Sequence, residues 1–254
     1  MKLIFKGLSN LNLGMNELSD LNVLEKVNLK NLKELDLALN NITDINILDK
    51  IMFEKIEKLD LSNNKISNIN ILENVNFKNL KELDLSCNEI SDIKVLENAK
   101  FENLEILRVG NKISNINILK KVNFKKLKIL DLSMNEISDI KVLEYVKFVK
   151  LEELDLGCNN ITDINVLDKV DFKELKELHL NSNKIEDIKV LENIKFDKLE
   201  ILHLSGNSIS DINIFKNVTF PKLENLYLAN NRIYKEENES LISELKSKIR
   251  RLII

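Results

Sequence analysis

The stretch LKELDLALN, residues 32–40, decides the fold, because close copies of it recur along the whole chain. The asparagine that closes each copy returns every 24 residues, except for one interval of 23 between Asn88 and Asn111. A fixed period of this length is typical of proteins built from stacked repeats, in which each copy forms one structural unit. The ten closing asparagines are Asn16, Asn40, Asn64, Asn88, Asn111, Asn135, Asn159, Asn183, Asn207 and Asn231.

The first half of each copy predicts a β-strand. Leucines two residues apart, as at Leu83 and Leu85, lie on one face of an extended chain, and the residue between them points to the other face. In-register stacking of the copies therefore predicts a parallel sheet with buried leucines.

The second half of each copy predicts a short helical segment. Ser91-Asp92 offers a helix N-cap, and Ile93, Val95 and Leu96 follow at spacings that suit one or two turns of α- or 3₁₀-helix. Because helical turns are wider than the spacing between strands, the stack should curve. The sequence predicts an α/β solenoid, a curved horseshoe with a parallel β-sheet on its concave face and short helical segments on its convex face.

These motifs resemble a known family. The run L-x-x-L-x-L-x-x-N is similar to the signature of leucine-rich-repeat proteins, and it covers nearly all of the chain. Its continuation N-x-I-x-D-I most resembles the subclass of the nuclear regulatory subunit of protein phosphatase one and of bacterial internalins, although the repeats here are longer and carry a phenylalanine near their end. The resemblance implies the horseshoe fold and a binding role for the concave face.

The ends of the array differ from its interior. Residues 1–254 are predicted to form a single domain, with ten repeats in residues 1–234 and a helical cap in residues 235–254. Within the cap, residues 236–250 read as an amphipathic helix and residues 251–254 as one more strand; a partner-binding helix is the alternative. Residues 1–7 are too short for a capping domain, so the natural protein has more chain there, the first repeat tolerates exposure, or it pairs with another molecule.

Composition excludes several classes of function. The formal net charge is −3, from 38 basic and 41 acidic residues, which argues against nucleic-acid binding. No apolar run is long enough to span a membrane, and Lys6 ends the first apolar run too early for a signal peptide, so a cytoplasmic location is expected. Cys87 and Cys158 form no metal-binding or disulfide pattern, and both are expected to be half-buried.

Two repeated polar or aromatic positions have a structural explanation. The asparagines should turn inwards and bond to backbone groups at each strand-to-loop corner. The phenylalanines should form an internal row between the sheet and the helical layer. This row consists of Phe53, Phe77, Phe101, Phe124, Phe148, Phe172, Phe196 and Phe220, with Leu29 in the equivalent place and Phe5 ahead of the first copy.

The candidate binding residues are the side chains between the two leucines of each L-x-L step, which should point out of the concave face. Because like charges one strand apart repel each other, a row of aspartates is not explained by sheet stability alone. Tyr and Arg, which also occur in the row, are favoured at protein interfaces. The alternative to a binding role is that the duplicated repeats simply retain their aspartate. After Asn12, the row consists of Asp36, Asp60, Asp84, Arg108, Asp131, Asp155, His179, His203 and Tyr227.

Apolar residues flank this row. Ile106, Ile129 and Ile201 should lie on the same face, and Met15, Leu39 and Met134 should extend an apolar patch along its rim. The shortened fifth repeat predicts a concave notch at residues 108–112, with Gly110 supplying backbone angles that other residues disfavour.

Metal, cofactor and catalytic sites are not expected. Asp155, His179 and His203 have the ligand types for zinc, but side chains on neighbouring strands must lean together to share an ion, and no supporting residues are evident. Five glycines are too few for a phosphate-binding loop, and no set of nucleophile, base and orienting residue can be named.

The sequence therefore predicts a non-enzymatic scaffold whose concave face binds a protein partner. One alternative is a regulatory or targeting subunit of an enzyme such as a phosphatase. Another is the repeat domain of a larger receptor, adhesin or effector. The chain is expected to be a monomer, or to self-associate weakly through its N-terminal edge.

Overall fold

The computed structural model defines the backbone of residues 3–4 and 7–254 and the side chains from residue 7 onward. The chain divides into two units, residues 1–129 and residues 130–254, and each is described by itself. The prediction that all 254 residues form a single domain stays a prediction.

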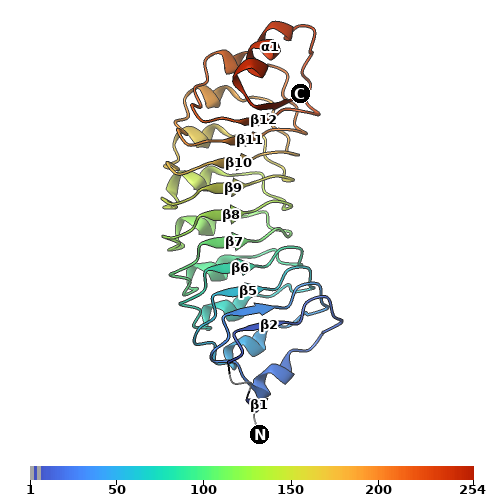
Figure 1. The fold of residues 1–254 in the computed structure, drawn as a ribbon, viewed down its shortest axis with the longest axis vertical. Helices are drawn as coiled ribbons and strands as arrows, with labels where there is room; N and C mark the ends of the chain where they lie inside the picture. The colour runs from blue at the N-terminus through green and yellow to red at the C-terminus, as the bar shows by residue number, and fades with distance from the viewer. Residues whose placement is uncertain (1–2, 5–6) are drawn as a thin grey trace. The chain divides into compact units, whose positions relative to one another are not determined.

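The first unit alternates short strands with 3₁₀-helices (Figure 1). Its elements are β1 (Leu3–Ile4), β2 (Asn10–Asn12), η1 (Asn22–Lys26), β3 (Val27–Asn28), β4 (Glu34–Asp36), η2 (Asn46–Asp49), β5 (Lys58–Asp60), η3 (Asn70–Glu73), β6 (Glu82–Asp84), η4 (Lys94–Glu97), β7 (Ile106–Arg108) and η5 (Asn117–Lys120). Strand β8 (Ile129–Asp131) falls at the division between the units.

The second unit repeats the same alternation and ends in an α-helix and a final strand. Its further elements are η6 (Lys141–Tyr145), β9 (Glu153–Asp155), η7 (Asn165–Asp168), β10 (Glu177–His179), η8 (Lys189–Glu192), β11 (Ile201–His203), η9 (Asn213–Lys216), β12 (Asn225–Tyr227), α1 (Glu239–Lys248) and β13 (Arg251–Ile253).

Both units contain a parallel sheet in which each strand pairs with its equivalent in the next repeat. In the first unit the order is β2-β4-β5-β6-β7, with Leu35 aligned to Leu59 and Leu59 to Leu83. In the second it is β9-β10-β11-β12-β13, with the same alignment of leucines. These leucines are fully buried, except that Leu252 of the last strand is half-buried, so the predicted solenoid of parallel strands and short helical segments is confirmed within each unit.

The helical segments are 3₁₀-helices of four or five residues. The N-cap of η4 is Ile93, which makes no side-chain cap hydrogen bond, so the N-cap predicted at Ser91-Asp92 is not found there. Asp92 Oδ1 instead accepts the N–H of Lys94, the first residue of η4, at 2.9 Å, from the position before the cap. Val95 and Leu96 bury its inner face. A 3₁₀-helix of this length is expected where only one turn can face the core before the chain must return to the sheet.

The asparagine ladder is structural, as predicted. Asn64 Nδ2 donates to the carbonyl oxygens of Leu37 at 3.0 Å and Leu61 at 3.1 Å, while its Oδ1 accepts the N–H of Ile42 at 3.0 Å. Asn183 makes the equivalent bonds in the second unit. Asn64 and Asn183 therefore each satisfy backbone groups of two successive repeats, whereas, among the described residues, Asn16 in the first copy bonds only to Leu13 and Gly14 of its own repeat.

The phenylalanine row is also confirmed. In the first unit, the ring centroids of Phe53 and Phe77 lie 5.9 Å apart and those of Phe77 and Phe101 lie 6.3 Å apart. Leu29 is buried in the equivalent place, whereas Phe220 is only half-buried. Phe5 lies outside the described residues.

The two ends contain elements that differ from the repeat. At the N-terminal end, β1 pairs in parallel with β3, which follows η1 in the next repeat. At the C-terminal end, α1 covers only residues 239–248 of the expected helix 236–250, and Leu241, Ile242 and Leu245 are buried. Strand β13 pairs with β12. Among the described residues, no helix is both long enough and apolar enough to cross a membrane.

The prediction that the two cysteines at the strand-to-loop corners are half-buried is wrong. Cys87 and Cys158 are exposed rather than half-buried, because both occupy the corner position whose φ is about +55° and whose side chain points outwards. In the described part of the chain, this left-handed position is filled by Met15, Leu39, Asn63, Cys87, Met134, Cys158, Ser182, Gly206 and Asn230.

The fifth repeat lacks this left-handed residue, and Gly110 has no positive φ either, so the glycine does not supply the disfavoured backbone angles that were predicted for it. Instead the corner is rearranged. Asn111 Oδ1 accepts the N–H of Asn88 at 2.8 Å and, more weakly, that of Ile90 at 3.4 Å. In the preceding repeat, Asn88 Oδ1 accepts the N–H of Ile66, the equivalent of Ile90, at 2.9 Å. The notch at residues 108–112 stays a prediction.

Candidate partner-binding face

We define the sheet face of each unit by the first and third residues of its strands, which lie on either side of the central leucine. In the interior strands these residues are half-exposed and the leucine is buried. The third-position row is Asn12, Asp36, Asp60, Asp84 and Arg108 in the first unit, and Asp131, Asp155, His179, His203 and Tyr227 in the second. The first-position row is Asn10, Glu34, Lys58, Glu82, Ile106 and Ile129 in the first unit, and Glu153, Glu177, Ile201, Asn225 and Arg251 in the second. Within each unit, the structure places every candidate residue on this face.

The repeated aspartate has a local structural role that sequence reasoning missed. Asp36 Oδ1 accepts the N–H of Ala38 at 3.0 Å, and Asp60 Oδ1 accepts that of Ser62 at 2.9 Å. The same bond recurs at Asp84, Asp131 and Asp155. One carboxylate oxygen thus closes the turn after each strand, a known habit of Asp and Asn side chains. This bond gives the aspartate row a stabilising role in the fold.

The aspartates are nevertheless under electrostatic stress. Burial raises the pKa of Asp84, and the neighbouring Asp60 raises it further, against the opposing effects of the Ser86 hydrogen bonds and of Arg108. Burial likewise raises the pKa of Asp155, with the Asp131 charge acting in the same direction. The row therefore contains carboxylates that a cationic partner would stabilise.

Arg108 is held by acidic residues of the preceding strand. Its Nη1 lies 2.8 Å from Glu82 Oε1 and 4.0 Å from Asp84 Oδ2, and Lys58 Nζ lies 3.0 Å from Glu82 Oε2. Burial would raise the pKa of Glu82, but these two cations outweigh it and the pKa is lowered. Arg108 thus belongs to an ion-pair network on the sheet face of the first unit.

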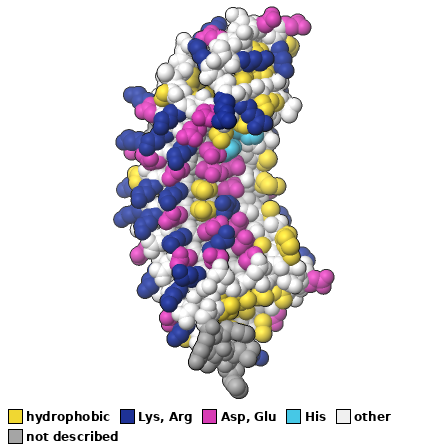
Figure 2. All heavy atoms as spheres, in the orientation of Figure 1, with side chains coloured by type: hydrophobic (Ala, Val, Ile, Leu, Met, Phe, Trp, Pro, Cys, Tyr) yellow, Lys and Arg dark blue, Asp and Glu magenta, His cyan; other side chains and the backbone are white. Residues whose placement is uncertain are grey.

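Three rings contact one another in a row along the sheet face of the second unit, the first pair edge to face and the second pair tilted. The ring centroids of His179 and His203 lie 5.9 Å apart, and those of His203 and Tyr227 lie 4.9 Å apart. The guanidinium carbon of Arg251 lies 5.5 Å from the Tyr227 ring centroid, a cation–π distance. His179 Nε2 is 3.2 Å from Glu177 Oε2. Figure 2 shows the two histidines (cyan) with acidic side chains (magenta) beside them.

The surroundings of His203 predict a lowered pKa for its imidazole, which can be tested. Burial, and secondly the neighbouring His179, lower its pKa below 6.5. The folded chain therefore binds this proton less readily than the unfolded chain, so His203 reduces stability as the pH falls through 6.5. We expect NMR titration to give His203 a pKa below 6.5, and the His179→Ala variant to move that pKa upwards. A His203 pKa at or above 6.5 in the parent would contradict this assignment.

Apolar side chains flank the charged rows. Ile106, Ile129 and Ile201 are half-buried at first positions of their strands. Met15 is 81% exposed and Met134 61% exposed at their left-handed corners. Large apolar side chains that remain this exposed at strained backbone positions are consistent with the expected apolar rim.

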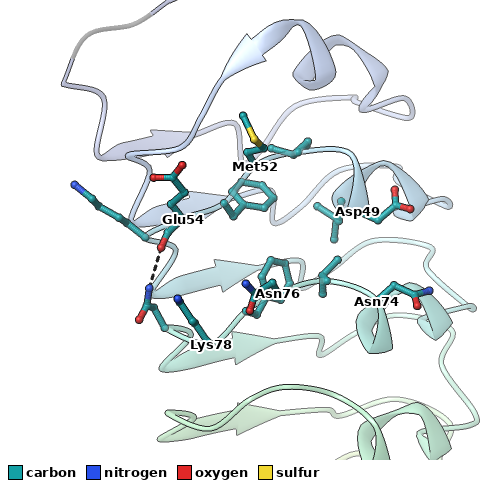
Figure 3. A pocket seen from close by; sticks show the side chains of 13 residues that line it. Asp49, Met52, Glu54, Asn74, Asn76 and Lys78 are labelled. Carbon is teal, nitrogen blue, oxygen red and sulfur yellow. Dashed lines mark hydrogen bonds between the residues drawn. The ribbon is translucent and has the colours of Figure 1, made fainter.

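A hollow in the first unit lies away from these rows and was not predicted. It has a volume of about 710 Å³ and is lined mainly by the chain segments that follow η2 and η3. Figure 3 shows Asp49 and Asn74 beside the helical segments and Met52 between them and Glu54. Met52 is exposed at a position that is polar in the next repeat, Asn76. A second hollow, of about 620 Å³, lies between η6 and η7.

Comparison with protein families agrees with this architecture. The family model described as Leucine Rich repeats (2 copies) matches residues 54–98, 78–121, 125–169, 149–195 and 173–217. A second model, described as Leucine Rich repeat, matches residues 28–45. The matched residues make up more than half of the chain. No curated protein sequence matches it.

Solved structures give the same result. An internalin, InlF, from Listeria monocytogenes is 25% identical over 97% of this chain and 80% of its own, with a TM-score of 0.58. Internalin C2 from the same species is 28% identical over 76% of this chain and 80% of its own, with a TM-score of 0.64.

A plant structure is also similar. It is the ectodomain of the membrane receptor kinase GASSHO1/SCHENGEN3 from Arabidopsis thaliana, in complex with Casparian strip integrity factor 2. It is 25% identical over 79% of this chain and 27% of its own, with a TM-score of 0.55.

Proposed function

The chain belongs to the leucine-rich-repeat family, and on that premise we propose that it is a non-enzymatic scaffold whose sheet face binds a protein partner. Proteins of this family generally act as interaction scaffolds. The complex of the plant receptor ectodomain with its factor supports the same role for a similar fold.

One observation carries the proposal. At five third positions an aspartate closes the turn that follows the strand. At His179, His203 and Tyr227 that aspartate is replaced, and the replacements form a row of contacting rings beside Ile201 and Arg251. These three strands lack the aspartate oxygen that stabilises the turn elsewhere, and a contact of the rings with a partner best explains this loss. Contacting aromatic side chains next to an arginine have the composition of an interface centre.

The charge of the sheet face indicates the chemistry of the partner. The partly buried carboxylates of Asp84 and Asp155 lie next to further aspartates of the row, and both have raised pKa values. A basic or strongly polar partner surface would relieve this repulsion and would be steered towards the face.

Two narrower roles are compatible with this proposal. The chain could be a regulatory or targeting subunit of an enzyme such as a phosphatase, or the repeat domain of a larger receptor, adhesin or effector. The similarity to two internalins favours the second of these roles.

The charge contribution can be tested without disturbing the fold. In the triple variant Asp36→Asn/Asp60→Asn/Asp84→Asn, the amide oxygen can still accept the turn N–H, as Asn12 Oδ1 does from Gly14 at 2.9 Å. Once affinity capture from native cell lysate has identified a partner, we expect this variant to bind it about tenfold more slowly at low salt, with less salt dependence.

The matched control neutralises three exposed glutamates of the 3₁₀-helices, as Glu25→Gln/Glu73→Gln/Glu97→Gln. It removes the same charge from outside the sheet face and should leave the association rate within about twofold. Circular dichroism should be unchanged in both variants. Equal loss of rate in the two variants would show that net charge, and not the sheet face, attracts the partner.

A further inference from the structure

Two carboxylates and an imidazole converge on the sheet face of the second unit. Strands β9 and β10 align Glu153 with Glu177, so these two side chains are cross-strand neighbours. His179 follows Glu177 by two residues and therefore lies on the same face. One carboxylate oxygen of each glutamate and one ring nitrogen of His179 all lie within 4.8 Å of one another.

We propose that Glu153, Glu177 and His179 form a binding site for a divalent transition-metal ion of the zinc class. Zinc bonds of about 2.0–2.2 Å place tetrahedral ligand atoms roughly 3.4 Å apart. The pair of His179 Nε2 and Glu177 Oε2 is already at 3.2 Å. The third ligand atom needs to move by little more than 1 Å, and all three side chains are only half-buried.

Electrostatics favours a cation at this point. Two carboxylates on adjacent strands repel each other, and Asp155, which aligns with His179 across the strands, adds a third negative charge nearby. The equivalent glutamate of the first unit, Glu82, is bonded by Lys58 and Arg108. At Glu177 the neighbouring group is instead the imidazole of His179, whose ring nitrogen can bind a metal ion directly.

The ligand types select the class of metal. Magnesium and calcium prefer shells made of oxygen atoms, whereas imidazole favours zinc, copper, nickel and other transition metals. Three protein ligands on an open face leave a fourth coordination position for water or for a side chain of another molecule. The fold does not depend on the ion, because buried leucines hold β9 and β10 together.

The test uses the full chain with both exposed thiols removed, as Cys87→Ser/Cys158→Ser, because cysteine competes for zinc. After chelation and buffer exchange, isothermal titration with zinc chloride should show one ion per chain. Zinc should also raise the melting temperature by about 2–4 °C, and magnesium should do neither. Cobalt in place of zinc should give a visible absorption band that reports tetrahedral ligation.

Variants locate the ion. His179→Ala and the double variant Glu153→Gln/Glu177→Gln should each weaken zinc binding at least tenfold and abolish the cobalt band. His203→Ala, which removes the adjacent imidazole of the same row, is the matched control and should change affinity by less than threefold. The proposal is overturned if the parent takes up no zinc, if His179→Ala binds as tightly as the parent, or if His203→Ala is the variant that loses the ion. Circular dichroism on each variant confirms that the fold is retained.

Discussion

Replacement of Phe77 by alanine is expected to destabilise the first unit by about 3–5 kcal/mol. The Phe77 side chain is 1% exposed and its ring stands between those of Phe53 and Phe101, at centroid distances of 5.9 and 6.3 Å. Alanine would leave a cavity in the space between the sheet and the 3₁₀-helices and would remove both ring contacts. Urea unfolding followed by circular dichroism measures the loss.

The leucine variant is the control for cavity formation. Leu29 fills the equivalent position in its own repeat and is 2% exposed, which shows that leucine can be packed there. Phe77→Leu should therefore cost less than half as much as Phe77→Ala, because most of the side-chain volume is retained. A cost below about 1 kcal/mol for the alanine variant would mean that the row is not a packed core.

The features that sequence predicted well are those that burial repeats at a fixed period. Leu59 and Leu83 occupy equivalent places 24 residues apart, and each is buried for the same reason. Asn64 and Phe77 recur with them because every corner needs the same backbone partners and every layer the same volume. Because each repeat has the same requirements for burial, hydrogen bonding and packing volume, the same residue types recur at a fixed spacing and can be recognised in the sequence.

The features that sequence missed depend on backbone geometry or on alignment between strands. The corner occupied by Cys87 requires a positive φ but tolerates Met, Leu, Asn, Ser and Gly, so no residue type marks it. In the shortened fifth repeat, the sequence predicted a special backbone role for Gly110. The structure shows instead that the residue missing from this repeat is the corner residue with positive φ. A deletion changes the path of the chain, and composition at the deletion does not reveal it.

The interactions of the third-position row illustrate both outcomes. The row was identified because alternate residues of a strand share a face. The bond from Asp60 Oδ1 to the Ser62 N–H spans only two residues, and the known habits of aspartate at turns could have suggested it. The approach of Glu153 to His179 could not be anticipated in the same way, because it depends on the lean of side chains across two strands.

Replacement of Asn64 by alanine is expected to cost about 3 kcal/mol, the second-largest effect on stability. The change removes the acceptor of the Ile42 N–H and the donor to the carbonyl groups of Leu37 and Leu61, all of which are buried. Each buried group left without a partner costs about 1–3 kcal/mol. The measurement is again urea unfolding at neutral pH.

Two further variants separate the hydrogen bonds from the loss of side-chain volume. Asn64→Asp keeps an acceptor for the Ile42 N–H but turns a second oxygen towards the Leu37 and Leu61 carbonyls, so it should be at least as destabilising as alanine although its size is unchanged. Asn76→Ala, at an exposed asparagine of the same repeat, should cost less than about 0.5 kcal/mol. If Asn64→Asp were as stable as the parent chain, the hydrogen bonds that Asn64 Nδ2 donates to Leu37 and Leu61 would contribute nothing to stability. The side chain would then stabilise its corner only by accepting the N–H of Ile42.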